Sequence, residues 1–435
     1  MPEFKTVRGM RDFLPEEAHV MRYVEAKERE IAQLYGFKEI MTPIVESYEL
    51  LSAKSGEEIR SRMFVFKDLG GRDVALRPEF TASVARLVAT TFRNEPKPFR
   101  LFSFGSIYRY DEPQKGRYRE IYQSNYELMG SSMPEADAEI LMLTDSLMKS
   151  VGLKKCAFKI GHVGILKSIL DQEKVGNKAQ NAAMQLMDKK QYDNALQAIK
   201  KAEASEKCIE ILRKLVELKG TKTVEIINKV KELVGYYPKS IESAQNLSEI
   251  ISLVCAAKGK MNITVDAGFA RGLEYYTGMI FEVYVPDLEI ALAGGGRYDK
   301  LIELFGGAQT PAVGVAHGID RIILAMQGQK TAVASREEKT AMVIPIQDEV
   351  KGEALRISET LRGQHIRVEV EVSGRKIANA LENANRRKLD YAIIVGEREL
   401  KDGAVVLRNL ASREQNIVKI ENLASIIRNA EMHSD

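Results

Sequence analysis

The chain contains few of the residues that build disulfide frameworks or metal sites. Three of its 435 residues are cysteine and five are histidine. Cys156, Cys208 and Cys255 are far apart and odd in number, so they predict neither a disulfide framework nor a metal-ligand pattern. We interpret them as small buried apolar side chains. The histidines have no triad or zinc spacing, which predicts structural or exposed positions for His19, His162, His317, His365 and His433.

The sequence also lacks a long apolar segment. No apolar run approaches the ~20 residues that span a bilayer, and Met1 to Lys5 lack the apolar stretch of a signal peptide. We therefore expect a cytoplasmic protein with no membrane partner. The formal net charge of +3 is small. It neither demands nor excludes nucleic acid, so any basic surface must be local.

The common nucleotide-binding fingerprints are missing as well. Gly294, Gly295 and Gly296 allow another group to approach the backbone closely, but their surroundings meet neither the Walker nor the Rossmann spacing. If ATP binds, we expect arginines and an antiparallel sheet to hold it. The length predicts two or three domains, and an apolar content of 45% is typical of ordinary globular cores.

The N-terminal part predicts one helix followed mostly by strands. Pro15 to Tyr35 predicts a helix because proline suits its first turn and Gly36 suits its end. Gly36 to Glu46 predicts a strand at an edge or an interface, because Pro43 cannot donate to a central ladder. We also expect a helix from Leu76 to Val88 and strands from Arg100 to Asp111 and from Arg119 to Gly130.

The composition changes between about Gly164 and Cys255. Ala, Lys, Glu, Gln and Leu dominate, and Gly and Pro become scarce. Apolar residues at helical spacing predict a helical insertion, as in Ile209, Leu212, Leu215, Val216 and Leu218. Its lysines allow two interpretations, a nucleic-acid contact or a solvated helical surface, and the second is the commoner.

Strands return after the insertion. We expect strands at Asn262–Phe269, Met279–Val285, Ala291–Gly296 and Pro311–Ala316, then a helix at Ile319–Leu324 and a linker at Gln327–Lys339. The remainder alternates strands and helices, which predicts a small α/β domain with a mixed sheet. Its expected strands are Ala341–Pro345, Arg367–Val372, Asp390–Gly396 and Ala404–Leu407, and its expected helices are Glu349–Gly363, Arg375–Lys388 and Glu421–Ala430.

A polar segment from Arg271 to Gly278 lies between two of these predicted strands. It contains one arginine, one acid (Glu274) and two tyrosines. An arginine presented by such a turn can bind a phosphate or carboxylate through two hydrogen bonds. The alternative is a glycine-rich hairpin with a surface arginine, and on this segment alone the two interpretations are evenly matched.

The predicted strand pair around residue 112 is a second polar site. Side chains alternate along a strand, so Arg109 and Asp111 share a face, and Gln123, Asn125 and Glu127 share another. Such a face is either solvated or lines a pocket, because buried polar groups without partners are destabilising. We favour the pocket, since the connecting loop carries further charges that can close over a polyphosphate. These charges are Lys115, Arg117 and Arg119.

These segments, in this order, resemble a class II aminoacyl-tRNA synthetase, specifically the histidyl-tRNA synthetase family. The strand around Pro43 resembles motif 1, a dimer-interface element, while Phe104–Gly130 resembles motif 2 and Gly314–Leu324 resembles motif 3. Arg271–Gly278 and Ala293–Asp299 are similar to the family's two signature peptides. Gln114–Arg119 and Arg77–Thr81 also match the family, and the resemblance covers nearly the whole chain.

The resemblance implies an α+β fold with a six-stranded antiparallel core flanked by helices, acting as a homodimer. It implies catalytic-core segments at 1–163 and 257–326, a helical insertion at 164–256, a linker at 327–339 and an anticodon-binding α/β domain at 340–435. The implied reaction converts histidine and ATP, with Mg²⁺, to histidyl-adenylate and pyrophosphate. Histidine is then transferred to the terminal ribose of tRNA(His).

The resemblance also implies roles for single residues in ATP binding and catalysis. Arg109 and Arg271 would hold the α-phosphate from two sides, with Arg271 in a place where other class II enzymes use a metal ion. We therefore expect no metal-ligand side chains. Arg117 and Arg321 would hold the β- and γ-phosphates, Arg321 also covering adenine. Asp111 would contact adenine.

For histidine, the implied contacts come from both signature peptides and from motif 2. Glu79 and Thr81 would receive the α-amino group, and Gln123 would lie near the carboxylate. We count Glu79 and Gln123 with the two α-phosphate arginines as catalytic residues. Glu127 and Tyr276 would bind the two imidazole nitrogens, and Tyr275 and Tyr298 would form the pocket wall.

Three residues depart from the family pattern. Asp111 replaces a glutamate, Phe80 a glycine near the amine site, and Ile121 an aromatic that stacks on adenine. On the expected helix Arg375–Lys388 of the C-terminal domain, five basic residues suit either contact with tRNA phosphates or a solvated face. They are Arg375, Lys376, Arg386, Arg387 and Lys388.

Two alternative functions remain at this stage. A histidine-sensing regulatory paralogue of ATP phosphoribosyltransferase shares the synthetase core. Such a paralogue typically has eroded signature peptides and lacks the C-terminal domain. This chain has intact signature peptides and a C-terminal domain. An RNA-binding module that uses only the tail domain would leave the predicted pocket without a purpose.

Overall fold

The structure is a computed structural model that describes residues 4–53, 56–112, 116–259, 261–271, 275–286, 288–333 and 339–429. Its internal contacts divide the chain into two compact units, Met1–Val333 and Ala334–Asp435. Each unit has its own sheet and its own apolar core. The expected linker overlaps the boundary between the units, and its residues 334–338 lie outside the described residues.

A large mixed sheet forms the centre of the first unit. Its strand order is β1-β5-β6-β12-β11-β10-β7-β9-β8. The six strands from β5 to β7 in this order are antiparallel to their neighbours, whereas β1 and β9 join them in parallel. The strands are β1 Lys38–Glu39, β5 Phe99–Tyr108, β6 Glu120–Met129, β7 Ala157–His162, β8 Lys219–Gly220, β9 Ile263–Asp266, β10 Met279–Val285, β11 Leu288–Arg297 and β12 Ala312–Gly318. The predicted fold class is confirmed, but six strands is too low a count because three short strands extend the sheet.

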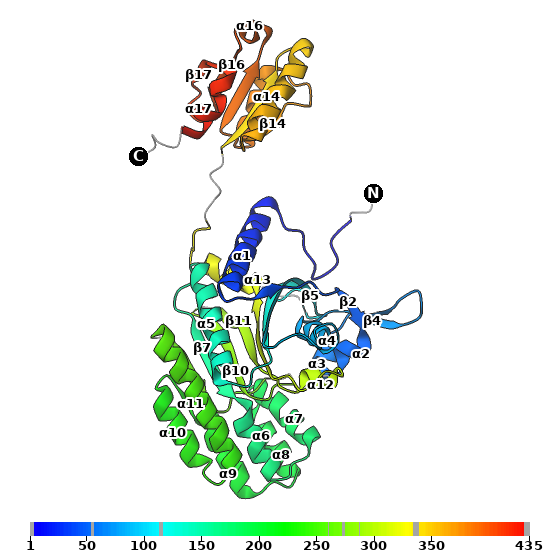
Figure 1. Ribbon diagram of the computed structural model, residues 1–435, viewed down its shortest axis with the longest axis vertical. Helices are drawn as coiled ribbons and strands as arrows, with labels where there is room; N and C mark the ends of the chain where they lie inside the picture. The colour runs from blue at the N-terminus through cyan, green and yellow to red at the C-terminus, as the bar shows by residue number, and fades with distance from the viewer. Residues whose placement is uncertain are drawn as a thin grey trace. The chain divides into compact units, whose positions relative to one another are not determined.

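Helices cover one face of this sheet and leave the other face for a pocket. α1 (Pro15–Leu34), α5 (Pro134–Ser150) and α13 (Ile319–Gly328) pack together on one side (Figure 1). On that side the Tyr126 hydroxyl donates to the carboxylate of Glu28 at 2.7 Å. The odd-numbered residues of β6 therefore point to the opposite face, since strand side chains alternate, and α4 (Thr81–Thr90) contacts β6 there.

The predicted strand around Pro43 is wrong as a single element. The chain forms β1 at the edge of the large sheet, passes Pro43 in an irregular segment, and forms β2 (Val45–Ser47) in a second sheet. That sheet has the order β2-β4-β3, with β3 at Val65–Lys67 and β4 at Asp73–Leu76. Proline disrupts ladder pairing, so the chain changes sheets there. Short helices follow at α2 Tyr48–Ser52, α3 Glu57–Arg60 and, later, α12 Leu301–Leu304.

The helical insertion is confirmed as helical and contributes one short strand. Its helices are α6 Val163–Gln172, α7 Asn177–Asp188, α8 Tyr192–Lys201, α9 Glu206–Glu217, α10 Thr223–Leu233 and α11 Pro238–Lys258. They form the green body of Figure 1, beyond the edge of the large sheet. Ile209, Leu212 and Leu215 are buried, as their helical spacing predicts. The strand β8 pairs with β9 and was not predicted.

The simple hairpin interpretation of Arg271–Gly278 is wrong. β9 and β10, the strands on either side of this segment, are not paired with each other. Instead β7 lies between them, parallel to β9 and antiparallel to β10. The segment therefore crosses over one strand rather than closing a two-residue turn. Residues 272–274, including Glu274, lie outside the described residues.

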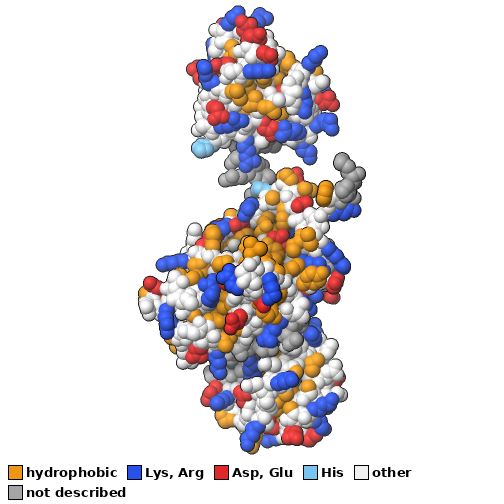
Figure 2. Space-filling view, turned by 90° about the vertical axis from the view of Figure 1, so that its right-hand side faces the viewer, with side chains coloured by type: hydrophobic (Ala, Val, Ile, Leu, Met, Phe, Trp, Pro, Cys, Tyr) orange, Lys and Arg blue, Asp and Glu red, His pale blue; other side chains and the backbone are white. Residues whose placement is uncertain are grey.

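The second unit has a five-stranded mixed sheet of order β14-β13-β15-β16-β17, as the alternating pattern predicts. Its elements are β13 Thr340–Pro345, α14 Lys351–Gly363, β14 Arg367–Val370, α15 Ile377–Arg386, β15 Tyr391–Val395, α16 Glu397–Leu400, β16 Ala404–Asn409, β17 Gln415–Lys419 and α17 Leu423–Asn429. The edge strand β17 was missed; its burial is low throughout. Lys and Arg side chains are interspersed with Asp and Glu on the face of this unit seen in Figure 2. Within the described ranges, no helix is long and apolar enough to cross a membrane.

Candidate active site

Small residues on two strands leave a hollow above the large sheet. Glu127 pairs with Gly314, which pairs with Gly296 on the next strand. One row along, Asn125 pairs with Ala316, and Ala316 pairs with Gly294. Side chains in the same cross-strand row share a face, so the polar side chains of β6 stand beside positions that have almost no side chain. The resulting pocket lies on the face opposite α1 and α5.

The deepest carboxylate of the pocket is that of Glu127, which is 1% exposed. It accepts hydrogen bonds from the Thr81 hydroxyl at 2.7 Å, from the Asn125 amide at 2.7 Å and from the Tyr298 hydroxyl. Burial raises the pKa of Glu127 to about 7, while these three donors act to lower the pKa. The carboxylate therefore changes charge near neutral pH and is positioned before any ligand enters.

A second carboxylate, Glu79, lies across the same pocket. The Tyr275 hydroxyl donates to it at 3.1 Å. Burial raises the pKa of Glu79, and the positive charges of Arg109 and Arg271 oppose that rise. The Tyr275 ring lies edge-on to the Tyr298 ring, with centroids 5.7 Å apart. The two carboxylates and their tyrosines form one continuous wall.

The backbone next to Glu79 is held in place by the buried side chain of Arg77. Arg77 donates to the carbonyl oxygens of Ser106 at 2.9 Å and Thr42 at 2.8 Å. Its guanidinium lies 4.2 Å from the centre of the Phe80 ring. Phe80 is 1% exposed and lies in the core. The departure from glycine at Phe80 is therefore accommodated by packing outside the pocket.

Three arginines line the other end of the pocket, and each is oriented by a backbone carbonyl. Arg109 donates to Pro78 at 2.8 Å, Arg271 to Phe281 at 3.3 Å, and Arg321 to Ala291 at 2.8 Å. Among the residues that the structure describes, none of these three arginines forms an ion pair. Their charge is therefore available to an anionic ligand.

Arg321 is in an electrostatically unfavourable position without such a ligand. Burial, together with the nearby positive charges of Arg109 and Arg117, lowers the pKa of Arg321 to about 10. That value still leaves Arg321 charged at neutral pH. An anion between these side chains would relieve the repulsion, and a polyphosphate carries enough charge to meet several arginines at once.

Two glycines are required by close approach of the functional side chains. A Cβ on Gly294 would lie 2.1 Å from Nη1 of Arg271, and a Cβ on Gly314 would lie 1.8 Å from Oε2 of Glu127. Neither distance is sterically possible, because real contacts of a Cβ lie beyond 3.0 Å. The glycine-rich segment predicted to allow close approach does so for protein side chains as well as for a ligand.

The pocket brings together most of the predicted site residues. Its lining includes Glu79, Thr81, Arg109, Gln123, Glu127, Arg271, Tyr275, Tyr276, Tyr298 and Arg321. Tyr276 lies beside Tyr275 and 5.7 Å from the guanidinium carbon of Arg271. Oε1 of Gln123 is buried without a hydrogen-bond partner within the described part of the chain. Ile121 also lines the pocket, as the departure from an aromatic residue predicts.

Two predicted nucleotide contacts lie outside the lining. Asp111 pairs with Arg62 at 3.0 Å, and Arg117 is exposed. Both are close enough for their charges to change the pKa of Arg321. Lys115, in the same loop, lies outside the described residues, whereas Arg119 is buried against the ring of Tyr110. The ATP contacts of Asp111 and Arg117 stay predictions.

Two pocket residues were not assigned a role from the sequence. Asn125 was placed on the pocket face, but its hydrogen bond to Glu127 depends on the side-chain conformation. Glu282 lines the pocket near Arg271, where it accepts from the Tyr284 hydroxyl at 2.5 Å and pairs with Lys159 at 3.5 Å. The sequence contained a signal for Glu282, since it is the one charged residue in the apolar strand Met279–Val285.

Comparison with known proteins identifies the family of this chain. The family model described as "Histidyl-tRNA synthetase" matches residues 9–322. A model described as "Anticodon binding domain" matches residues 340–430. A protein named Histidine--tRNA ligase from Methanocaldococcus jannaschii is 42% identical, covering 97% of this chain and 99% of that protein. Another of the same name from Saccharolobus solfataricus is 37% identical, covering 98% and 99%.

Solved structures share the fold. A protein from Bacillus halodurans C, described as an ATP phosphoribosyltransferase regulatory subunit/histidyl-tRNA synthetase, has a TM-score of 0.77 at 25% identity. It covers 91% of this chain and 99% of its own. Histidyl-tRNA synthetase from S. aureus has a TM-score of 0.68 at 24% identity and covers 98% of this chain and 100% of its own. On the family match and the full-length relatives, this chain belongs to the histidyl-tRNA synthetase family.

Proposed function

We propose that the chain activates histidine with ATP and transfers it to tRNA, and its relatives named Histidine--tRNA ligase support the joining of histidine to tRNA. The observation that carries this proposal is a single pocket with two chemically different ends. One end has buried carboxylates and tyrosines, and the other has three arginines without ion-pair partners among the described residues. An amino acid suits the first end and a polyphosphate suits the second.

The arginine end supports adenylate formation. Attack of a carboxylate on the α-phosphate builds negative charge on the phosphoryl oxygens. Arg109 and Arg271, oriented by backbone carbonyls, would stabilise that charge without rearranging. Arg321 and Arg117 would receive the outer phosphates, and Asp111 would lie on the adenine side, where its charge acts on Arg321. Most of the remaining rate enhancement would come from positioning two bound reactants.

The carboxylate end supports recognition of histidine. Neutral imidazole presents one hydrogen-bond donor and one acceptor. Glu127 would accept from one ring nitrogen and Tyr276 would donate to the other. Glu79 and Thr81 would receive the α-amino group, Gln123 the carboxylate, and Tyr275 and Tyr298 would wall the ring. An analogue without one ring nitrogen would leave a buried polar group unpaired, so discrimination on the order of a thousandfold or more is expected.

ATP is the nucleotide substrate of the family, and Mg²⁺ generally accompanies it. Among the described residues, no group of three or more His, Cys, Asp or Glu is arranged to hold a metal ion. Mg²⁺ usually keeps several waters and binds through one or two carboxylates plus substrate phosphates. We therefore treat Mg²⁺ as part of the ATP substrate, with Glu282 as a pocket carboxylate whose charge acts on Arg271 and Arg321.

The second unit would read the anticodon of tRNA(His). Of the five basic residues predicted for phosphate contact, Arg375 pairs with Glu371 and Arg387 pairs with Glu369. Within the described ranges Lys376, Arg386 and Lys388 form no ion pair, and they are the candidates for backbone phosphates.

A homodimer is also part of this proposal. The β1–β2 region exposes large apolar side chains, among them Met41, which is 88% exposed, and Val45. Exposed apolar groups at a sheet edge favour association with another chain. Light scattering after size-exclusion chromatography should give twice the mass of one chain. A single-chain mass at micromolar concentration would remove the dimer from the proposal.

The experiment that tests the function is charging of tRNA with labelled histidine by the purified chain. We expect histidine-dependent label in acid-precipitable tRNA. A regulatory histidine sensor would bind histidine but charge no tRNA, and it would not need the three arginines. Histidine binding without charging, by a folded protein, would therefore favour that alternative.

A further inference from the structure

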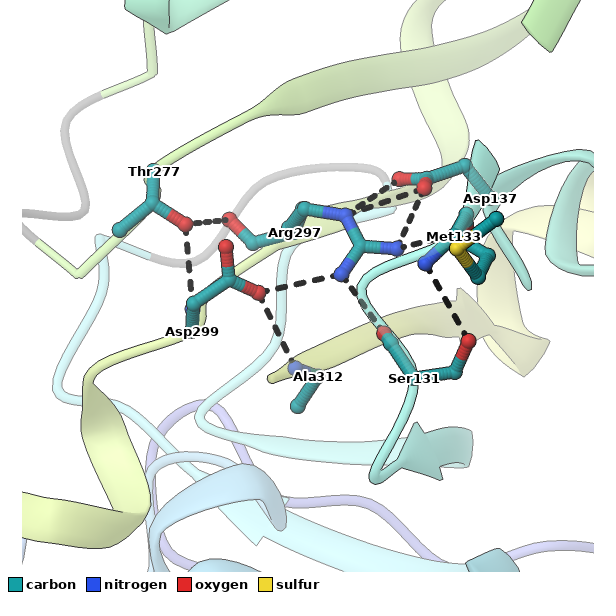
Figure 3. A network of polar contacts seen from close by, with 7 residues as sticks. All are labelled: Ser131, Met133, Asp137, Thr277, Arg297, Asp299 and Ala312. Atoms are coloured by element: carbon teal, nitrogen blue, oxygen red, sulfur yellow. Dashed lines mark hydrogen bonds and ion pairs between the residues drawn. The ribbon is translucent and has the colours of Figure 1, made fainter. Parts of the chain in front are cut away.

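Arg297 lies at the end of β11, one residue before Tyr298, and is buried away from bulk solvent. Its side chain is 7% exposed. A guanidinium has five N–H donors, and here each has an acceptor (Figure 3). Nε and Nη2 donate to the carboxylate of Asp137, Nη2 also to Met133 O at 3.3 Å, and Nη1 to Ser131 O at 2.9 Å and Asp299 Oδ1 at 3.1 Å. The group is fully satisfied and does not line the substrate pocket.

The partner carboxylate is also fully buried. Asp137 lies in the first turn of α5, and its side chain is 0% exposed. Both of its oxygens accept from Arg297. A buried pair with this geometry is strongly destabilised when one partner is removed, because the other charge stays behind without compensation. The pair therefore locks the start of α5 to the end of β11.

The same cluster joins the two signature segments. The Thr277 amide donates to the carbonyl of Arg297 at 2.8 Å, and the Asp299 amide donates to the Thr277 hydroxyl at 3.0 Å. Oδ1 of Asp299 also accepts from the Ala312 amide at 3.2 Å. A Cβ on Gly278 would lie 2.8 Å from Cδ of Arg297. The segments 276–278 and 297–299 are thus packed as one unit on the Arg297 side chain.

The pocket residues are the immediate chain neighbours of this unit. Tyr298 lies between Arg297 and Asp299, and its hydroxyl reaches Glu127. Tyr276 precedes Thr277, and its ring lies 4.9 Å from that of Tyr275. A shift of the Arg297 cluster would move Tyr298 and Tyr276 together. The pocket arginines are oriented by carbonyls outside this cluster: Arg109 by Pro78, Arg321 by Ala291 and Arg271 by Phe281 of β10.

We propose that Asp137 and Arg297 are positioning residues for amino-acid recognition. Their buried pair holds Tyr298 and the Tyr275–Tyr276 segment around the imidazole, so it sets the affinity for histidine without touching the substrate. This inference rests on the proposed function of the pocket. Histidine binding would then depend on the Asp137 side chain of helix α5, and ATP binding would not.

The test is Asp137→Asn, which keeps the shape and replaces one acceptor by an amide N–H that faces a guanidinium donor. The KM values for histidine and ATP are measured by ATP–pyrophosphate exchange. We expect the KM for histidine to rise about tenfold or more, since small misplacements at a binding site have effects of this size. The KM for ATP should stay within about twofold, as expected when the altered group does not act on ATP binding.

A matched control lies on the same helix. Glu139 accepts from Arg100 through both oxygens, at 2.7 Å and 2.9 Å, and neither residue lines the pocket. Glu139→Gln should leave both KM values unchanged. Equal rises in the two KM values for Asp137→Asn, or no rise beyond that of Glu139→Gln, would overturn the proposal.

Two further variants separate the outcomes. Arg297→Lys keeps the charge but has fewer donors, and it should raise the histidine KM selectively as well. It serves as the test if Asp137→Asn does not fold. Unselective loss with Arg297→Lys would count against positioning. Tyr298→Phe removes the hydroxyl that donates to Glu127, and an unchanged histidine KM would show that the position of this hydroxyl does not matter, which counts against the positioning role. If exchange by the wild-type chain does not need histidine, the proposed function itself fails.

Discussion

The two ends of the pocket differ in how their side chains are stabilised before a ligand arrives. At the carboxylate end, Glu127 accepts three hydrogen bonds from protein side chains, and Glu79 accepts one from Tyr275. At the arginine end, Arg109, Arg271 and Arg321 contact backbone carbonyls, and burial together with the charges of Arg109 and Arg117 lowers the pKa of Arg321. The first end is preorganised to select, and the second is charged to receive an anion.

This difference suits the two substrates. Discrimination among amino acids depends on a few atoms, so the groups that contact them must be placed accurately. Phosphate oxygens are numerous and strongly charged, so an arginine cluster can bind them from several directions. An anion beside Arg321 would offset the effects of burial and of the charges of Arg109 and Arg117, which lower the pKa of Arg321.

The largest expected effect comes from Arg271→Ala. Removing a group that stabilises transition-state charge reduces the rate by about 10²–10³, or about 2.7–4 kcal/mol. We expect this loss in the rate of exchange, with a much smaller change in the KM for histidine. A loss of less than about tenfold, roughly 1.4 kcal/mol, would remove Arg271 from the phosphoryl site. Unchanged thermal unfolding is the control for the fold.

A pair of glycine substitutions separates the ends next. Gly314→Ala places a Cβ against Glu127, and Gly294→Ala places one against Arg271. Overpacking of this kind disturbs its neighbours by about 1–3 kcal/mol, which corresponds to about 5- to 150-fold. Steady-state exchange should show a raised histidine KM for the first variant and a reduced kcat for the second. The same change in both variants would contradict the division of the pocket.

The dependence of histidine binding on pH tests Glu127. Burial raises the pKa of its carboxyl to about 7, and an imidazole N–H binds the ionised form. Binding should therefore weaken as the pH falls through 7, by about tenfold between pH 8 and pH 6, beyond the effect of imidazole protonation itself. Calorimetric titration measures it. Glu127→Gln should bind more weakly and lack this additional tenfold; equal pH profiles for both proteins would refute the assignment.

The smallest effect is expected for Asp111→Asn. Asp111 pairs with Arg62 and does not line the pocket, although its charge acts on Arg321. We expect the KM for ATP to change by less than about fivefold, since exposed and partly exposed pairs contribute at most about 1 kcal/mol. A change above tenfold would return Asp111 to direct contact with the nucleotide.

The sequence predicts this pocket well where polarity conflicts with the surrounding strand. Gln123, Asn125 and Glu127 stand out because polar residues on one face of an apolar strand require partners; Asn125 and Glu127 bond to each other, and Oε1 of Gln123 is left for a ligand. The resemblance to a family then predicted which acids and arginines meet. Ten predicted residues do line one pocket.

The remaining features depend on packing that periodicity does not encode. The sequence predicts strands on both sides of Arg271–Gly278 but not that β7 lies between them. It does not separate β1 from β2, since Pro43 marks only a break. The network of Arg297 was also not predicted, because Asp137 and the carbonyls of Ser131 and Met133 come from a distant segment, and only Asp299 is near in sequence.

The most direct test of the account is ATP–pyrophosphate exchange by the purified wild-type chain with each amino acid supplied separately. We expect exchange with histidine and at least about a thousandfold less exchange with each other amino acid, since each of them would leave Glu127 or Tyr276 unpaired. Absence of exchange with histidine from a folded protein, or comparable exchange with a second amino acid, would contradict it.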